Sequence, residues 1–190
     1  IRLSLVGSEM CIRDRTYALV NLLDNLKRLP GDIPIDVHII GDGNCRNLIR
    51  ISDYTPRIRF IFTSFLMGSV RDVYIQENID LMVTMGIAAL DCANLSLPVV
   101  IAPAASKQFK NNQYVYLYDT DSYSLGWHPQ EIEQLNLTTH SIEKIIEDIY
   151  AKNGKKEIGR RCYYFCHDTF DVGKSAEKLL RCIEKSELSA

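Results

Sequence analysis

The sequence predicts an α/β fold in which a parallel β-sheet is flanked by helices. Short β-branched apolar runs recur along the chain, and segments with helical spacing or turn residues separate them, which is the pattern of βαβ units. The chain has 190 residues, 46% hydrophobic and 24% charged, a composition typical of a packed globular domain and not of a disordered one. A formal net charge of -2 provides no overall positive field for binding nucleic acid.

Residues 1–15 read IRLSLVGSEMCIRDR and resemble a translated sequencing-adapter artefact, so we interpret them as a non-native leader and exclude them from the fold. A short strand at 3–6 followed by a polar turn is the alternative. The apolar stretch is too short for a signal peptide. The exclusion implies that the natural protein begins upstream, and it leaves open that the first strand of the domain is missing.

The chain from Thr16 onward alternates helices and strands. Leucines at helical spacing predict a first helix that ends at Pro30 and Gly31. The expected strands are 35–40, 58–62, 79–83 and 98–102, with helices at 45–51, 70–76 and 86–95 between them. Because each strand is joined to the next through a helix, the strands should be parallel, with right-handed crossovers, as in a Rossmann-like sheet.

The second half of the chain is expected to be mostly helical. Residues 114–118 alternate aliphatic and tyrosine side chains and predict a fifth strand. Isoleucines at 142, 145, 146 and 149 share one helix face, with Ser141 as the N-cap. Apolar residues between 176 and 183 share the face of a last helix, with Asp171 as its N-cap.

The candidate binding site follows the strand at 79–83. Ligands of open parallel sheets bind beyond the carboxyl ends of the strands, and a helix that begins there offers free N–H groups and a positive dipole end to a phosphate. Gly86 would let a diphosphate approach the backbone, and Asp91 would accept hydrogen bonds from ribose hydroxyls. The residues assigned to this nucleoside-diphosphate site are Thr84, Met85, Gly86, Ile87, Ala88 and Asp91, together with Gly41 and Gly43 from the loop after strand 35–40.

Each of these residues also has a structural interpretation. Asp91 fits a surface carboxylate of a helix, and Gly86 fits a turn glycine that only reverses the chain. For Gly41 and Gly43 the structural interpretation is the stronger one, because an isolated Gly-x-Gly pattern is weak evidence. Tyrosine, leucine and tryptophan in 123–127 (YSLGW) fit either a loop at the substrate cleft or, more simply, packing at a domain edge.

Residues 90–100 resemble a motif of the GT-B glycosyltransferases, in the donor-binding half of the retaining enzymes that use nucleotide sugars. In that family an acidic residue opens a helix of small residues, and the next strand begins Gly-x-Pro-Val-Val. Here Asp91 stands for the usual glutamate and Ser96 for the usual glycine. Residues 37–43 resemble the family's strand ending in Gly-x-Gly, and Thr169 with Phe170 resembles the pair before its C-terminal helix.

This resemblance implies a hexosyltransferase of carbohydrate biosynthesis that takes a UDP- or GDP-sugar and transfers the sugar to an acceptor hydroxyl. It makes 16–168 the nucleotide-sugar-binding domain and 169–190 a crossover helix, with the N-terminal acceptor domain absent and the fragment inactive alone. It implies no metal and no other cofactor. The expected location is the cytoplasm, and the expected partners include a peripheral membrane acceptor but no nucleic acid.

Two departures from the family pattern keep other functions open. The first acid of the family's glutamate pair is replaced by Val83, and the arginine and lysine that neutralise the donor diphosphate would precede Thr16. The alternatives are half of an enzyme like the UDP-GlcNAc epimerases, although 84–88 lacks the Ser-Gly-Gly stretch usual there, and a non-catalytic domain that binds a nucleotide or a protein. Cys162, Cys166 and His167 are interpreted as helix packing, because zinc would need further ligands nearby.

Overall fold

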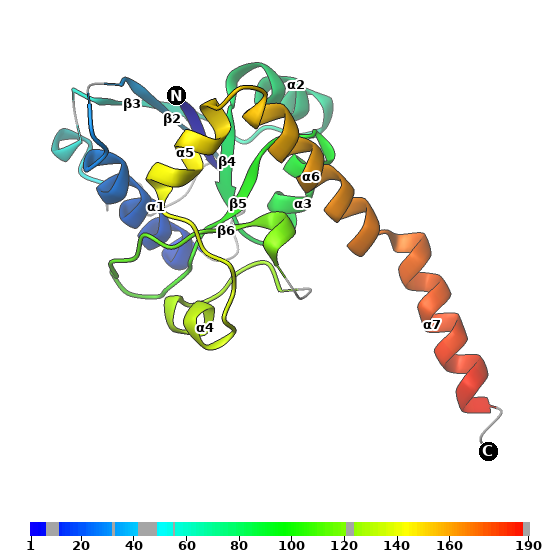
Figure 1. The fold of residues 1–190 in the computed structure, drawn as a ribbon. Helices are drawn as coiled ribbons and strands as arrows, with labels where there is room; N and C mark the ends of the chain where they lie inside the picture. The colour runs from blue at the N-terminus through cyan, green and yellow to red at the C-terminus, as the bar shows by residue number, and fades with distance from the viewer. Residues whose placement is uncertain (7–11, 32, 42–48, 55, 121–123, 188–190) are drawn as a thin grey trace.

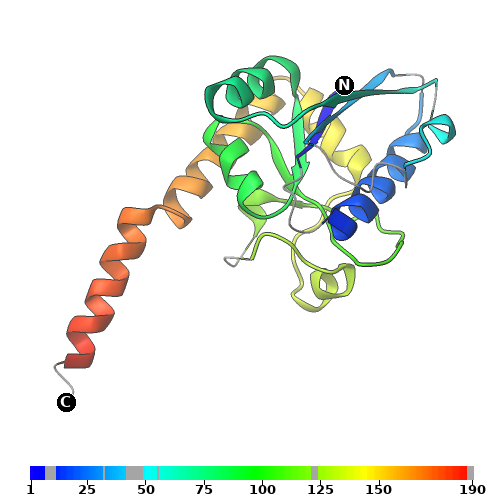
Figure 2. The same ribbon diagram turned by 180° about the vertical axis from the view of Figure 1, so that it is seen from behind.

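The computed structural model describes residues 1–6, 12–31, 33–41, 49–54, 56–120 and 124–187. Six strands form one sheet in the order β3-β2-β1-β4-β5-β6, and helices pack against both of its faces (Figures 1 and 2). The first five strands run parallel and β6 runs antiparallel to β5. The predicted α/β fold with a helix-flanked parallel sheet is therefore confirmed. The strands are β1 (Arg2–Val6), β2 (Ile35–Ile40), β3 (Ile58–Thr63), β4 (Leu81–Thr84), β5 (Val99–Ile101) and β6 (Val115–Tyr116).

Helices connect the strands and follow the sheet. They are α1 (Ile12–Lys27), α2 (Gly68–Asn78), α3 (Ile87–Asn94), α4 (Pro129–Gln134), α5 (Ile142–Tyr150), α6 (Gly154–Thr169) and α7 (Val172–Glu187). The two predicted N-caps are present: the Ser141 side chain accepts a hydrogen bond from the Lys144 amide, and Asp171 accepts one from the Lys174 amide. α7 continues away from the body of the molecule, and its apolar residues Leu179, Leu180 and Ile183 are exposed (Figures 1 and 2).

The first residues of the chain belong to the fold, contrary to the sequence-based exclusion of 1–15. β1 pairs with β2 on one side and β4 on the other, and Leu3 is fully buried between them. The short strand considered as the alternative is therefore the one observed, with bounds at Arg2 and Val6. The exclusion failed because it rested on the resemblance of the segment to an artefact, whereas apolar residues there supply the central strand that β2 and β4 need.

Two other expected elements differ in detail. Within 114–118 only Val115 and Tyr116 form a strand, and a 3-10 turn at Leu117–Asp119 follows. The helix expected at 45–51 falls mainly on residues outside the described part of the chain. A 3-10 turn begins at the last residue of that range and spans Ile51–Asp53.

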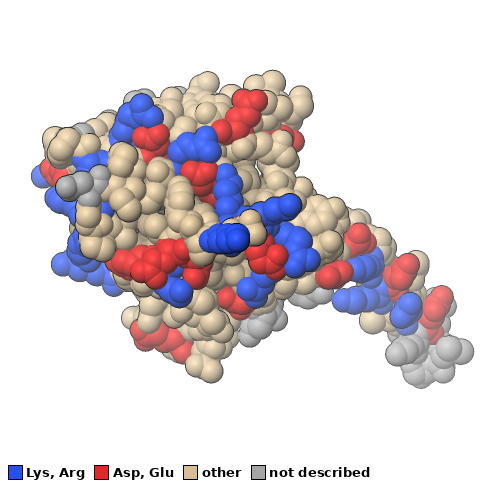
Figure 3. Space-filling model, turned by 45° about the horizontal axis from the view of Figure 1, so that its top comes forward, with Lys and Arg blue, Asp and Glu red and all other residues tan. Residues whose placement is uncertain are grey.

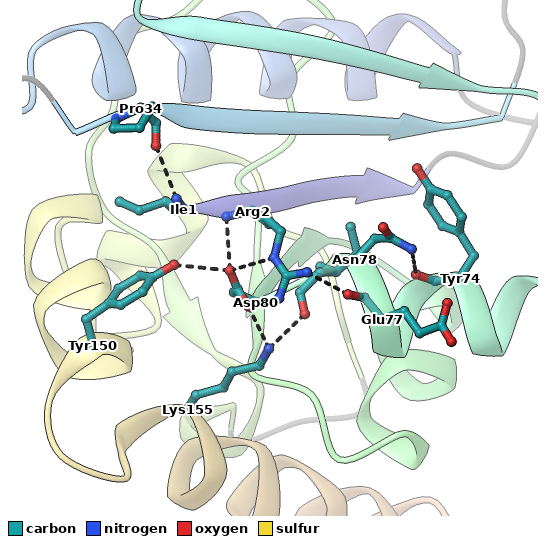
Figure 4. A network of polar contacts seen from close by, with 10 residues as sticks. Ile1, Arg2, Pro34, Tyr74, Glu77, Asn78, Asp80, Tyr150 and Lys155 are labelled. Atoms are coloured by element: carbon teal, nitrogen blue, oxygen red, sulfur yellow. Dashed lines mark hydrogen bonds and ion pairs between the residues drawn. The ribbon is translucent and has the colours of Figure 1, made fainter.

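A network of charges closes the edge of the sheet where β1 and β4 begin (Figure 4). The Asp80 carboxylate accepts hydrogen bonds from the Arg2 guanidinium at 2.9 and 3.2 Å, from Lys155 Nζ at 2.7 Å and from the Tyr150 hydroxyl at 3.1 Å. Burial opposes ionisation of Asp80, but the hydrogen bonds from Arg2 and Lys155 outweigh it and hold the pKa well below its usual range. The network thus ties β1, β4, α5 and α6 together.

The surface around this edge carries charges of both signs. In Figure 3, Lys and Arg side chains lie beside Asp and Glu side chains on the face shown, and neither sign forms a continuous field there. A surface of this kind favours paired charges over long-range attraction of a polyanion.

Candidate functional site

The carboxyl ends of five parallel strands meet at the edge of the sheet opposite the Asp80 network. β1 to β5 run in the same direction, so the segments that follow them lie along one edge. In this family of architectures, ligands bind at that edge. Both α2 and α3 begin there, directly after the loops that follow β3 and β4.

Gly86 forms the turn between β4 and α3. Its backbone has φ 66° and ψ -149°, a conformation that is essentially restricted to glycine, and it is the N-cap of α3. Its N–H donates to the Leu125 carbonyl at 2.7 Å, so this amide is already occupied. The next amides, of Ile87 and Ala88, belong to the first helical turn and have no acceptor within their own helix. These two amides and the positive end of α3 are what the turn offers to an anion.

The side chains around the turn divide into buried and exposed ones. Thr84 and Met85 lie at the carboxyl edge of the sheet, but they are only 1% and 9% exposed. Their side chains are therefore buried and do not face solvent there. Ile87 is 78% exposed, while Gly86 and Ala88 are partly exposed.

Asp91 lies one turn further along α3, on the same side of the helix as Ile87, because residues four apart are neighbours on a helix. Its side chain is 40% exposed. Its Oδ2 accepts a hydrogen bond at 2.8 Å from Nη1 of Arg71 in α2. Arg71 also binds Asp72, and although burial opposes the charge of Arg71, the hydrogen bond to Asp72 and the attraction of Asp91 raise its pKa above its ordinary value.

The glycine pair predicted after β2 is only partly visible. Gly41 directly follows β2 with φ 113° and donates its N–H to the Thr63 carbonyl at 3.0 Å, so it joins the ends of β2 and β3. Gly43 lies outside the described residues. The segment after β1, where the GT-B resemblance expects an arginine and a lysine, begins with residues 7–11, which also lie outside the described part of the chain.

Sequence reasoning missed several features of this edge. Three apolar side chains are exposed just after the carboxyl end of β3: Phe65 and Met67 in the loop, and Val70 in the first turn of α2. Arg71 was not predicted either, because the resemblance to the GT-B family places the basic residues after the first strand of the domain. The sequence feature that could have indicated Arg71 is a basic residue in the first turn of the helix that precedes β4.

The aromatic segment 123–127 serves packing in its described part. Leu125 and Trp127 are both buried, and the Leu125 and Trp127 carbonyls accept hydrogen bonds from the amides of Gly86 and Ala104. The interpretation of packing at an edge is therefore confirmed for Leu125 and Trp127. The hydrogen bond to Leu125 also holds the Gly86 turn in place.

The cysteines proposed as helix packing occupy the α6 interface. Cys162 is fully buried, and its Sγ lies 3.4 Å from the Val99 amide nitrogen, which donates to it. Burial raises the pKa of the Cys162 thiol to about 12, which disfavours a thiolate. Among the described residues, no three His, Cys, Asp or Glu side chains are grouped closely enough to hold a metal ion. The expectation of a metal-free site remains a prediction.

A cavity of about 340 Å³ lies at the other edge of the sheet, between the turn after α3 and the start of α6. Its lining includes Ser96, Ile149, Gly154 and Lys155. The Lys155 ammonium group is already bound to Asp80 and to the Ile79 carbonyl.

No helix in the described part of the chain is both long and apolar enough to cross a membrane.

Comparison with known proteins supports the fold and leaves the sequence without a family match. No protein-family model and no curated protein matches the sequence. The structure is similar to that of HepE of Anabaena, determined in complex with UDP, with a TM-score of 0.51 and 13% identity over 96% of this chain and 48% of HepE. A chain of a GtfA/B complex matches with a TM-score of 0.49 and 16% identity, over 97% of this chain and 36% of its own length, a score below that of a shared fold.

The chain thus spans about half the length of HepE. At 13% identity this likeness concerns the fold alone. The likeness agrees with the Rossmann-like α/β fold that the sequence predicts.

Proposed function

We propose that this chain is the donor-binding half of a glycosyltransferase and binds a nucleoside-diphosphate sugar at the carboxyl edge of its sheet. The observation that carries the proposal is the Gly86 turn, which opens α3 at that edge with a half-exposed carboxylate, Asp91, one turn away. The diphosphate would bind at the first-turn amides of α3, and the ribose at Asp91. The likeness of the fold to a protein crystallised with UDP supports the same ligand class.

The chemistry of the reaction suits such a site. When the sugar leaves the nucleoside diphosphate for an acceptor hydroxyl, the bond between its anomeric carbon and a phosphate oxygen breaks, and negative charge develops on the diphosphate. Preorganised amides and a helix dipole stabilise charge of this kind without a metal ion. The amides of Ile87 and Ala88 are the groups of α3 that would do so. The acceptor would be bound by a second domain, and we place the reaction in the cytoplasm with a peripheral membrane acceptor.

The proposal is tested by calorimetric titration of UDP and GDP into the 190-residue chain. One of the two should bind, and Asp91→Asn should weaken that binding about 10-fold or more, because hydrogen bonds to a charged acceptor contribute about 1.5–3 kcal/mol. Glu157→Gln is the matched control, since Glu157 is also an exposed helical carboxylate paired with an arginine, Arg160, but on α6. Absence of binding by both nucleotides would overturn the proposal.

The nature of the reaction needs the whole protein. Product analysis with a UDP-sugar or GDP-sugar and acceptor distinguishes sugar transfer from epimerisation of the nucleotide sugar. Binding without either product would identify a nucleotide-binding domain that does not catalyse. The replacement of the first acid by Val83, which is fully buried in β4, is the feature that makes this distinction necessary.

A further inference from the structure

We propose that Arg71 is a positioning residue of this site and holds the Asp91 carboxylate in the orientation that accepts the ribose hydroxyls. The inference rests on the proposed function and adds to it a residue from a different helix. It also assigns a specificity: the site should prefer a ribonucleotide over the same nucleotide without ribose hydroxyls.

The guanidinium group of Arg71 connects two helices. It sits in the first turn of α2, which begins just after β3 and so near the carboxyl edge of the sheet. Its Nη1 donates to Oδ2 of Asp91 at 2.8 Å, while its Nε donates to Oδ1 of Asp72 at 3.0 Å. The Arg71 guanidinium group therefore bridges the carboxylate of Asp72 on α2 and that of Asp91 on α3.

This bridge restricts a side chain that would otherwise be mobile. An exposed aspartate on a helix samples several rotamers, and ordering it upon ligand binding lowers affinity. The Arg71 side chain is 28% exposed, so its pair with Asp91 is partly shielded from water. Asp72 in turn holds the guanidinium group at its other side. The carboxylate of Asp91 is thus oriented before any nucleotide arrives.

The hydrogen bond uses only part of the carboxylate. Arg71 engages Oδ2 of Asp91, and among the described residues no donor contacts Oδ1. A carboxylate has about four lone-pair positions, so Oδ1 and the second lone pair of Oδ2 remain for hydroxyl donors.

The charge of the cluster also favours hydroxyls over phosphate. Arg71 contributes one positive charge, and Asp72 and Asp91 together contribute two negative charges, so the cluster remains an acceptor of hydrogen bonds. An anion would be repelled from Oδ1 of Asp91 and would bind instead at the start of α3. Ribose and diphosphate are therefore directed to different parts of the same helix.

The test compares UDP with 2′,3′-dideoxy-UDP on the same protein by calorimetry, using the full chain. If UDP and its analogue bind too weakly, the GDP pair replaces them. The wild type should favour the ribonucleotide about 10-fold or more. Arg71→Gln should reduce this ratio at least 3-fold, and Asp91→Asn should bring it close to one. Arg71→Lys, which keeps the charge but not the fork, should lie between wild type and Arg71→Gln.

The ratio separates positioning from folding. A variant that is partly unfolded binds both nucleotides less and leaves the ratio unchanged. Arg160→Gln, which breaks an exposed arginine–carboxylate pair on α6, should keep the wild-type ratio. A wild-type ratio in Arg71→Gln would overturn the role of Arg71 and leave the proposed function standing. An unchanged ratio in Asp91→Asn, or no nucleotide binding by the wild type, would overturn the proposed site itself and the inference with it.

Discussion

At the edge where the parallel strands begin, charges are paired and apolar side chains are packed, whereas at the edge where they end a carboxylate and several apolar side chains face solvent. Asp80 at the first edge carries hydrogen bonds from three side chains and is 13% exposed, while Asp91 at the second carries one and is 40% exposed. Ile79 is fully buried and Ile87 is 78% exposed. The comparison places the buried and charge-paired residues at one edge and the residues of the proposed nucleotide site at the other.

The largest expected contrast is between these two isoleucines. Ile79→Ala should lower the free energy of unfolding by about 2–5 kcal/mol, because it leaves a cavity in the core. Ile87→Ala removes an exposed side chain, so the change should stay within about 0.5 kcal/mol. Chemical denaturation of both variants measures the difference. Equal losses would show that the carboxyl edge is as tightly packed as the amino edge.

The charge network should give the next largest effect. Asp80→Asn removes the negative charge that Arg2 and Lys155 surround, and we expect a loss of about 2 kcal/mol in the free energy of unfolding, reduced from the value for fully buried pairs because both bases are partly exposed. Asp168→Asn, which breaks an exposed pair with Lys174, should cost less than about 0.5 kcal/mol. Thermal or urea denaturation at neutral pH distinguishes the two. A similar result for both variants would mean that the network does not stabilise the fold.

Gly86→Ala should lower the free energy of unfolding by about 1–2 kcal/mol. A Cβ at Gly86 would meet no atom within 4 Å, so the whole effect should come from the backbone conformation. Gly126→Ala is the control, since the added Cβ would lie at an ordinary 3.6 Å from Met85 and the backbone has no positive φ. Nucleotide affinity should fall in Gly86→Ala and not in Gly126→Ala. Comparable stability of the two variants would argue against strain at Gly86.

The smallest effect concerns pH. Because the pKa of Asp80 is lower in the folded state than its value of about 3.9 in unfolded chains, protons bind the unfolded state preferentially in acid. The stability due to Asp80 is therefore complete above about pH 5 and declines as pH falls below about 4. The difference in unfolding free energy between wild type and Asp80→Asn should shrink from pH 7 to pH 3, by about 1 kcal/mol. If the difference in unfolding free energy between wild type and Asp80→Asn grew as the pH fell, the pKa of Asp80 would not be lowered in the folded state.

Local patterns in the sequence were sufficient for most of the sheet and for the helix ends. The strands at 35–40, 58–63 and 99–101 are runs of β-branched and aromatic residues, and Ser141 and Asp171 are caps that act within three residues. β1 was not predicted because residues 1–15 resemble an artefact, and a five-residue segment does not itself show that it has partner strands on both sides.

The parts of the site that depend on distant residues were not predictable in the same way. Gly86 and the start of α3 follow from a strand–glycine–helix pattern, and the structure places them at the carboxyl edge of the sheet. The pairing of Asp91 with Arg71, 20 residues away, depends on how α2 and α3 lie against each other. The hydrogen bond from Gly86 to Leu125 likewise depends on a loop from the second half of the chain.

Gly159 of α6 supports the end of α3 through a main-chain contact that side chains alone would not provide. A Cβ at this position would lie 2.0 Å from the Ser96 carbonyl oxygen, so two main chains touch directly where α3 has just ended. Main-chain contacts cannot be repacked by rotamer changes, and α3, at eight residues, is only about 12 Å long. The C-terminal end of α3 is thus anchored by a main-chain contact, which fixes the direction of this short helix and of the amides in its first turn.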